Sequence, residues 1–218
     1  MFINLLQVHP TYYVTWVLAV IASVVLHELG HGFAAIRQGD RTPIVSGHMT
    51  LNPMVHMGGI SLILLAVVGL AFGAMPVNPS AFRGRFGRAA VAFAGPAVNL
   101  LIAASTILLA GLLVRTGLAT LPMWEPHVIP YRLDSVTILL IVAQLNLALF
   151  AFNLLPIPPL DGSTVLGDFW PSWRRWTQNP DLAPFFQGGF LLVFIFGWRL
   201  FHAAGTAVDV AFHALAGH

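Results

Sequence analysis

Long runs of apolar residues separated by short polar stretches dominate the sequence. Five such segments stand out, at residues 11–36, 58–74, 89–114, 135–155 and 185–204. The apolar residues do not alternate with polar ones as they do in transmembrane strands, so each segment is expected to be helical. At about 1.5 Å per residue, four segments can cross about 30 Å of hydrocarbon, and the segment at 58–74 is marginal.

The composition places the chain in a membrane. Hydrophobic residues make up 57% of the sequence and charged residues only 8%, and the mean hydropathy is +0.82, whereas soluble domains carry far more charge. The expected fold is an all-α polytopic membrane protein with about five to six transmembrane or re-entrant helices. We expect a single membrane-embedded domain over residues 1–218, with a motif-bearing core at about 11–165 and a C-terminal helix and tail at 185–218.

Two further features narrow the fold and the chemistry. The stretch RTPIVSGHMTLNP is rich in Thr, Val, Ser, Gly and Pro, which predicts a small β-hairpin near residues 41–52. The chain has no Cys, so any metal must be bound by His, Asp or Glu. The net charge is only +2, and the Arg residues flank apolar runs, so a nucleic-acid partner is not expected.

The first apolar segment contains the sequence VVLHELGHGF, with His27, Glu28 and His31 inside a predicted membrane helix. Ionisable groups are costly at that depth, and their presence there indicates function. Positions i and i+4 share one face of a helix, so His27 and His31 can bind one zinc ion. Glu28 lies about 100° around the helix, where it can act as a general base on water without binding the metal.

A catalytic zinc site usually has a third protein ligand. The best candidate is Asp161, in the sequence NLLPIPPLDG at the end of the fourth apolar segment. Proline cannot continue a helix, so the backbone is expected to unwind there, and an unwound segment at membrane depth is tolerated where it lines a polar cavity. From spacing alone, an ordinary Asp-Gly turn at a helix end is the alternative.

HELGH together with NLLPIPPLDG resembles the site-2 protease family of intramembrane zinc metalloproteases, and Gly95–Asn99 resembles that family's G-P-x-x-N element. The resemblance covers roughly residues 20–165. It implies that His27, His31 and Asp161 bind one zinc ion and that Glu28 is catalytic. No PDZ domain of the kind found in regulated family members is expected here.

The resemblance also implies that Asn99 and Asn153 lie near the site and contact the substrate or the oxyanion. The alternative for both residues is a hydrogen bond to a neighbouring helix, which is a common role of Asn in membrane helices.

The depth of the ligands constrains the topology. His31 lies near the end of the first span and Asp161 just after the fourth, so these two spans must run in the same direction. This requires residues 58–74 to be re-entrant or to cross incompletely. Most Arg residues then fall on the zinc side, and the positive-inside rule places that side toward the cytoplasm of a bacterial cell membrane.

The sequence therefore predicts an intramembrane zinc metalloprotease that cleaves transmembrane segments of protein substrates within or beside the lipid bilayer. A zinc transporter or metal-binding scaffold is one alternative, although it has no need for Glu28 outside the ligand set. A catalytically silent helix-binding relative is another. The sequence does not indicate an oligomeric state.

Overall fold

The structure is a computed structural model of the chain, and it describes residues 2–126, 128–130 and 132–217. Within these residues the regular secondary structure is entirely helical, as the apolar pattern predicts. Its elements are η1 (Phe2–Asn4), α1 (Leu5–Val8), α2 (Pro10–Arg37), α3 (Thr42–Val45), α4 (Pro53–Val68), η2 (Pro79–Ala81), α5 (Gly87–Arg115), α6 (Ser135–Asn153), α7 (Asp161–Phe169), α8 (Pro171–Thr177), η3 (Pro180–Leu182), α9 (Ala183–Phe196) and α10 (Trp198–Ala216).

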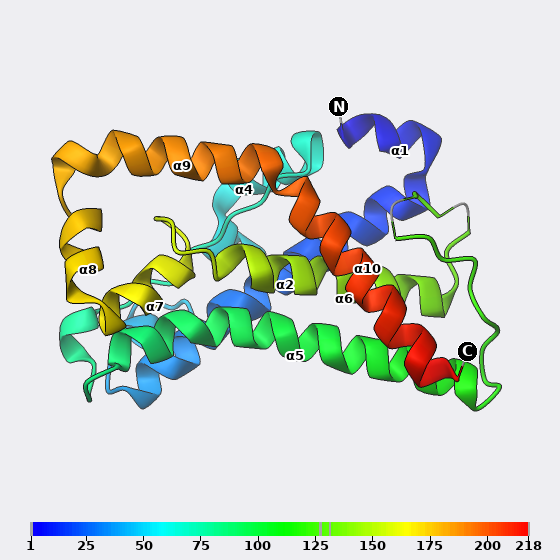
Figure 1. The fold of residues 1–218 in the computed structure, drawn as a ribbon, viewed down its shortest axis with the longest axis horizontal. Helices are drawn as coiled ribbons and strands as arrows, with labels where there is room; N and C mark the ends of the chain where they lie inside the picture. Colours follow the sequence, from blue (N-terminus) through cyan, green and yellow to red (C-terminus); the bar gives the residue numbers. More distant parts are fainter. Residues whose placement is uncertain (1, 127, 131, 218) are drawn as a thin grey trace.

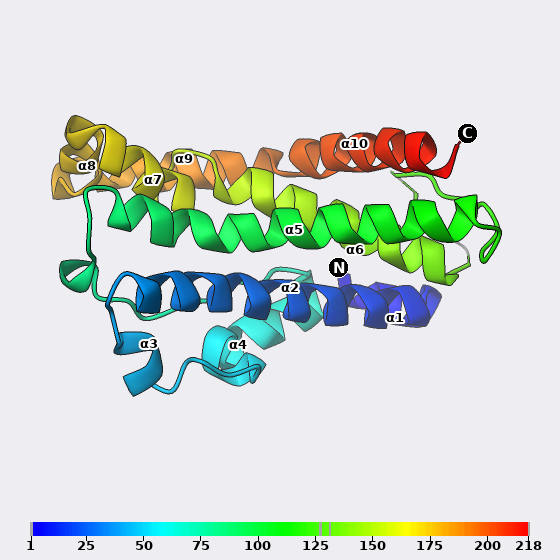
Figure 2. The same cartoon turned by 90° about the horizontal axis from the view of Figure 1, so that it is seen from below.

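Among the described residues, three helices are long and apolar enough to cross a membrane: α2, α5 and α6. They contain 28, 29 and 19 residues, which corresponds to about 28–44 Å of helix. Helices α2, α5, α6 and α10 pack together along one long axis (Figure 1), and α5 lies between α2 and α10 (Figure 2). The predicted number of five to six membrane helices is not confirmed, because only the bent pair α9–α10 adds a possible fourth span.

The fifth apolar segment differs from the expected single helix followed by a short tail. The chain bends by 47° between α9 and α10, and α10 continues to Ala216. Val208 and Phe212 of α10 are almost completely buried against Ile107 and Leu140. The predicted tail is therefore a core helix, because its amphipathic face covers the α5–α6 pair.

Small residues let α5 approach its neighbours closely. A Cβ added to Gly30 of α2 would lie 2.9 Å from the carbonyl oxygen of Ala94, and one added to Gly111 would lie 2.6 Å from Cβ of Leu215. Membrane helices associate largely by such packing, since lipid is as apolar as the side chains it replaces. The backbone of α5 is thus held against α2, which carries the HELGH motif.

The predicted β-hairpin near residues 41–52 is wrong. The segment forms the one-turn helix α3 and then a turn at Gly47, which has φ +73°, and the structure has no strand among the residues it describes. Asp40 explains the difference, because its Oδ1 accepts hydrogen bonds from the backbone N–H and the hydroxyl of Thr42, at 2.8 and 2.6 Å. These bonds start a helical turn where the composition indicated a strand.

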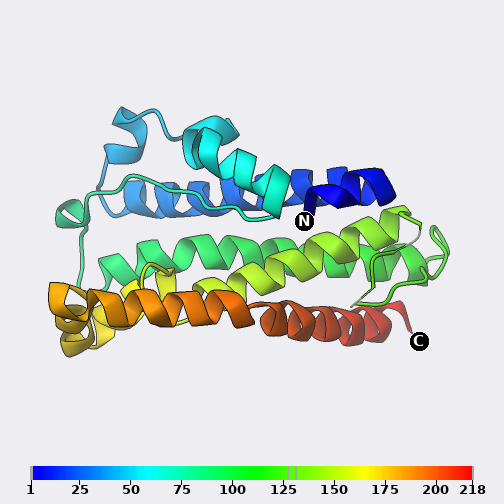
Figure 3. The ribbon, with the colours of Figure 1, turned by 90° about the horizontal axis from the view of Figure 1, so that it is seen from above.

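The apolar segment around residues 58–74 does not run through the bundle. Helix α4 is broken by a kink at Gly58, which has φ 67° and ψ 169°, so its continuous part from Gly59 to Val68 is only about 15 Å long. It stops at Gly69, which has φ +85°, a common helix stop. The chain then returns in extended form along α2 (Figure 3). Ser61 exchanges hydrogen bonds with the N–H and carbonyl groups of Phe72, and the Ala74 N–H donates to the His56 carbonyl at 3.0 Å.

Asp40 holds the two ends of the segment between α2 and α5 together. Its side chain is only 1% exposed, and its Oδ2 accepts a hydrogen bond from the backbone N–H of Asn78 at 2.6 Å. Close by, the Arg83 N–H donates to the Gln38 carbonyl at 3.1 Å. The end of α2 and the approach to α5 therefore lie at the same end of the bundle. As the depth argument requires, α2 and α6 then run in the same direction.

Replacing Asp40 should loosen this closure. Burial raises the pKa of Asp40, but the hydrogen bonds from Thr42 and Asn78 outweigh it and hold the pKa below its ordinary value. Asp40→Ala is expected to lower the free energy of unfolding by about 2–3 kcal/mol at pH 7, measured by chemical unfolding in detergent micelles. Exposed Asp181 supplies the control, and Asp181→Ala should change little.

The pH dependence follows from the sign of the shift. A lowered folded-state pKa contributes stability above the unfolded-state value, and this contribution is lost as pH falls through the folded-state value. The difference between wild type and Asp40→Ala should therefore shrink below about pH 4. An equal difference at pH 3 and pH 7 would contradict this role of the Asp40 carboxylate.

Candidate metal centre

Helix α2 presents His27 and His31 on one face, a single turn apart, as their spacing predicts. The two Nε2 atoms are 3.0 Å apart, and the rings meet edge to face. Both side chains are buried, each residue being 8% exposed. The tight contact of α2 with α5 encloses them from one side.

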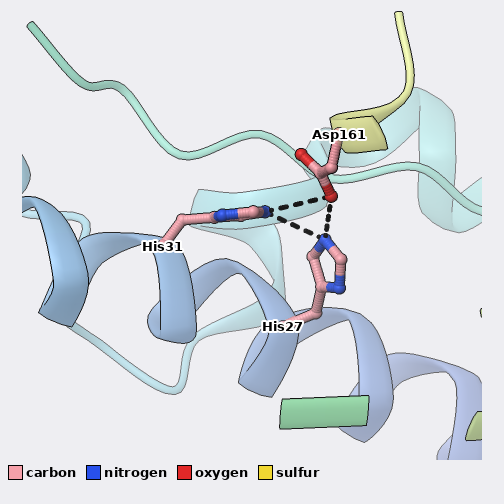
Figure 4. A group of neighbouring side chains, drawn as sticks. All are labelled: His27, His31 and Asp161. Carbon is pink, nitrogen blue, oxygen red and sulfur yellow. Dashed lines mark hydrogen bonds and ion pairs between the residues drawn. The ribbon is translucent and has the colours of Figure 1, made fainter. Parts of the chain in front are cut away.

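Asp161 reaches the same point from the far end of the fourth apolar segment. Helix α6 ends at Asn153, the chain unwinds through a proline-rich stretch, and α7 begins at Asp161. The Asp161 Oδ2 lies 3.2 Å from His27 Nε2 and 3.4 Å from His31 Nε2 (Figure 4). Gly162 is required beside it, because a Cβ there would collide with the carbonyl oxygens of Leu154 and Leu155.

The hydrogen bonds made by the Nδ1 atoms determine whether the Nε2 atoms facing Asp161 carry a proton or a lone pair. His31 Nδ1 donates to the carbonyl oxygen of Val91 at 2.8 Å, and His27 Nδ1 donates to Asn99 Oδ1 at 2.6 Å. Each neutral imidazole has one N–H, so both Nε2 atoms carry lone pairs. Three electron-rich atoms thus face one point, an arrangement that a cation stabilises.

The spacing of these atoms fits zinc. Donors at about 2.0–2.2 Å from one tetrahedral zinc ion lie about 3.3–3.6 Å from each other, close to the observed separations of 3.0, 3.2 and 3.4 Å. Two imidazoles and one carboxylate also form a common set of protein ligands for catalytic zinc. The three residues are therefore close enough, and of the right kind, to hold one zinc ion.

Gly95 of α5 forms the floor of this centre. A Cβ at Gly95 would lie 2.6 Å from His27 Nε2 and closer still to His31 Nε2. Only a residue without a side chain leaves room for an ion between the rings and α5. The sequence singled out the Gly95–Asn99 stretch by resemblance, but only the packing of α2 against α5 explains why its first residue is glycine.

Glu28 lies beside the three converging residues but is not one of them. It is 7% exposed, and the extended segment after α4 passes over it so closely that a Cβ at Gly73 would lie 2.8 Å from Glu28 Oε1. Glu28 and the three converging residues together line a cavity of about 450 Å³. The Glu28 carboxylate therefore faces the same cavity as the three residues that could bind a metal, without being one of them.

The two Asn residues occupy different positions. Asn153 lines the cavity, and its Nδ2 donates to the Leu149 carbonyl one turn earlier at 3.0 Å. Asn99 is fully buried behind the His27 ring. The substrate contact expected of both residues stays a prediction, and for Asn99 the structure adds an interhelical hydrogen bond, to Asn146 Oδ1 at 2.8 Å.

A membrane-helix bundle that buries two His and one Asp around a single point, beside a further carboxylate, defines the class of intramembrane metallopeptidases. The sequence matches Peptidase family M50 over residues 15–131 and 130–196. The chain belongs to this family, and it is an intramembrane zinc metalloprotease.

Relatives in three bacteria support this assignment, and each is named as a zinc metalloprotease. YwhC of Bacillus subtilis (strain 168) is 37% identical over 161 residues, covering 73% of this chain and 70% of YwhC. Rip2 of Mycolicibacterium smegmatis is 34% identical over 200 residues, or 86% and 70% of the two chains. Rip2 of Mycobacterium tuberculosis (strain H37Rv) is 36% identical over 182 residues, or 80% and 62%. No solved structure is significantly similar.

Adding one methyl group at Gly95 should exclude the metal. Gly95→Ala is expected to reduce bound zinc from about one ion per chain to below about 0.1, because the new Cβ occupies the space beside both Nε2 atoms. Elemental analysis of the purified protein measures this. Gly111→Ala, on the same helix and in tight contact with Leu215, is the control and should keep zinc. Full zinc occupancy in Gly95→Ala would contradict this geometry.

Proposed function

We propose that His27, His31 and Asp161 are the zinc ligands and that Glu28 is the general base for hydrolysis of peptide bonds in transmembrane segments of protein substrates. The observation that carries this assignment is the convergence of three donor atoms within 3.4 Å, beside a buried carboxylate that is not one of them. A transport scaffold requires the ligands but not the additional carboxylate.

Bound zinc would supply Lewis-acid polarisation of the scissile carbonyl and would lower the pKa of the attacking water. The Glu28 carboxylate takes the proton from that water and passes it to the nitrogen of the leaving amine. Asn99 and the Val91 carbonyl hold the two imidazoles in the tautomer that binds a metal. Asn153 lines the cavity wall, which supports its proposed contact with the substrate backbone.

The extended segment after α4 supports the binding of an unwound substrate. The backbone groups of Phe72 and Ala74 pair with α4, and those of Gly73 and Met75 lie on the opposite edge because successive residues in an extended chain face opposite sides. Both residues line the cavity. A substrate strand placed along this edge would bring its peptide bonds to Glu28 by strand addition.

The distribution of Arg supports an orientation with the metal centre toward the cytoplasm. The first group of Arg residues lies at the end of the bundle that holds Asp40: its members end α2, precede α3, precede or begin α5, or belong to α8. At the opposite end, Arg115 ends α5 and Arg132 precedes α6. The residues of the first group are Arg37, Arg41, Arg83, Arg85, Arg88, Arg174 and Arg175. Positive residues favour the cytoplasmic side.

Glu28→Gln tests the catalytic assignment. The variant should bind about one zinc ion per chain, as wild type does, yet cleave a transmembrane model substrate about 10²–10⁴-fold more slowly. Glu125→Gln, in the loop between α5 and α6, is the control and should leave cleavage unchanged. Wild-type cleavage by Glu28→Gln would exclude the general-base role, and loss of zinc would place Glu28 among the ligands.

Cysteine labelling tests the orientation, and the natural chain contributes no background because it lacks Cys. Ser46→Cys and Ser80→Cys, both exposed on the re-entrant side, should react with an impermeant maleimide only when the cytoplasmic face is open. Thr116→Cys, after α5, should react from the outside of intact cells. Labelling of Ser46→Cys and Ser80→Cys from opposite sides would refute the re-entrant topology.

A further inference from the structure

The two imidazoles of the metal centre are oriented by different kinds of acceptor. His31 donates to a backbone carbonyl, that of Val91, and a carbonyl can only accept. His27 donates to the side-chain amide of Asn99, and an amide can present either an oxygen or an NH₂ group to its neighbour. If Asn99 turned its NH₂ group toward the ring, His27 Nδ1 would have to accept, and the proton would move to Nε2.

A buried chain of hydrogen bonds decides which end Asn99 presents. Asn99 Nδ2 donates to Asn146 Oδ1 at 2.8 Å. Asn146 Nδ2 donates in turn to the Val142 carbonyl and to Ser23 Oγ, both at 2.9 Å. Asn99 and Asn146 are 0% exposed and Ser23 is 2% exposed, so water does not compete for these bonds.

The order of donors along this chain is set at its far end. The Val142 carbonyl accepts only, so it fixes the NH₂ group of Asn146 on its own side and turns Oδ1 toward Asn99. That oxygen requires the NH₂ group of Asn99, which leaves Asn99 Oδ1 facing His27. His27 must then carry its proton on Nδ1, and its Nε2 lone pair faces His31 and Asp161.

We propose that Asn146 is a positioning residue for the metal centre, acting on His27 through Asn99 and supported by Ser23 and the Val142 carbonyl. This inference rests on the proposed function, in which His27 is a zinc ligand. Outer hydrogen-bond partners fix the tautomer and orientation of ligand His residues, and their loss weakens metal binding. Here the residue that orients the ligand is not its direct partner Asn99 but the next one, Asn146, and the bonds between them join α2, α5 and α6.

The alternative is that Asn146 only joins helices. Gln144 provides a matched comparison on the same helix, because it is also buried and its Nε2 donates to two backbone carbonyls, those of Pro126 and Phe201, at 3.1 Å each. Replacing either residue removes interhelical hydrogen bonds. Only Asn146 is linked to His27, so only its replacement should change the metal centre.

The experiment measures zinc affinity of the full chain in detergent micelles by competition with a chromogenic chelator. Asn146→Leu should weaken zinc binding by about tenfold or more, and Ser23→Ala should cause a smaller, severalfold loss. Gln144→Leu should bind zinc as wild type does. His27→Ala should lose tight binding and reports on the proposed function itself.

A second readout follows the tautomer directly. In metal-free protein labelled with ¹⁵N-histidine, the His27 resonances should show Nδ1–H in wild type and in Gln144→Leu, and a shift toward Nε2–H in Asn146→Leu. If Asn146→Leu does not fold, the zinc affinity of Ser23→Ala decides, because that variant removes one of the bonds that hold Asn146 while the Val142 carbonyl still orients its amide.

The outcomes separate the two proposals. Wild-type zinc affinity and an unchanged His27 tautomer in Asn146→Leu would overturn the positioning role and leave the ligand assignment standing. If Asn146→Leu does not fold, wild-type zinc affinity in Ser23→Ala has the same meaning. Equal zinc loss in Gln144→Leu and Asn146→Leu would also overturn it, because general loosening of the bundle would then suffice. Wild-type affinity in His27→Ala would overturn the ligand assignment and the positioning role with it.

Discussion

The hydrocarbon core of a membrane contains no water, so a polar group placed there must be paired by the protein itself. The metal centre depends on this constraint at every level. His27 is paired with Asn99 and Asn99 with Asn146. This series of hydrogen bonds ends at the backbone carbonyl of Val142 in α6. Because each of these bonds is shielded from solvent, the arrangement of donors and acceptors is determined by the packing of three helices rather than by the ligands alone.

Close helix packing is the second requirement, and glycine supplies it. Gly30 brings α2 against α5, and Gly95 then places bare backbone under the two imidazoles. Further along, Gly73 lets the returning chain pass over Glu28. The centre is therefore enclosed by backbone on two sides, which leaves the cavity as the approach to it and keeps Glu28 close to any peptide held along the extended segment.

Sequence reasoning predicted the parts of the structure that depend on local spacing. The i, i+4 relation of His27 and His31 brings their rings together, and the proline-rich unwinding after α6 delivers Asp161 to them. The requirement that both ends of the site share one depth predicted that α2 and α6 run in the same direction, as they do (Figure 2), and the re-entrant path of residues 58–74 stays a prediction. Each of these inferences uses a constraint that the sequence displays directly.

The features that were missed depend on contacts between distant residues. The β-hairpin is the exception: composition indicated a strand, but the local bonds between Asp40 and Thr42 start a helical turn. The bond from Asp40 to Asn78, 38 positions away, could not be foreseen. The C-terminal segment was predicted to be a tail because its pairing with Ile107 and Leu140 cannot be read from periodicity. Likewise, Asn146 resembles any other Asn in a membrane helix until Ser23 and Asn99 are placed beside it.

The burial of Glu28 so close to Asp161 has a consequence for ion selection. With both carboxylates ionised and both imidazoles neutral, the four side chains carry a formal charge of −2. A divalent cation brings the total to zero, whereas a monovalent or trivalent ion leaves a net charge in a medium of low dielectric constant, where uncompensated charge is costly. Electroneutrality alone thus discriminates among ions by valence, before ligand softness or coordination geometry distinguishes one divalent metal from another.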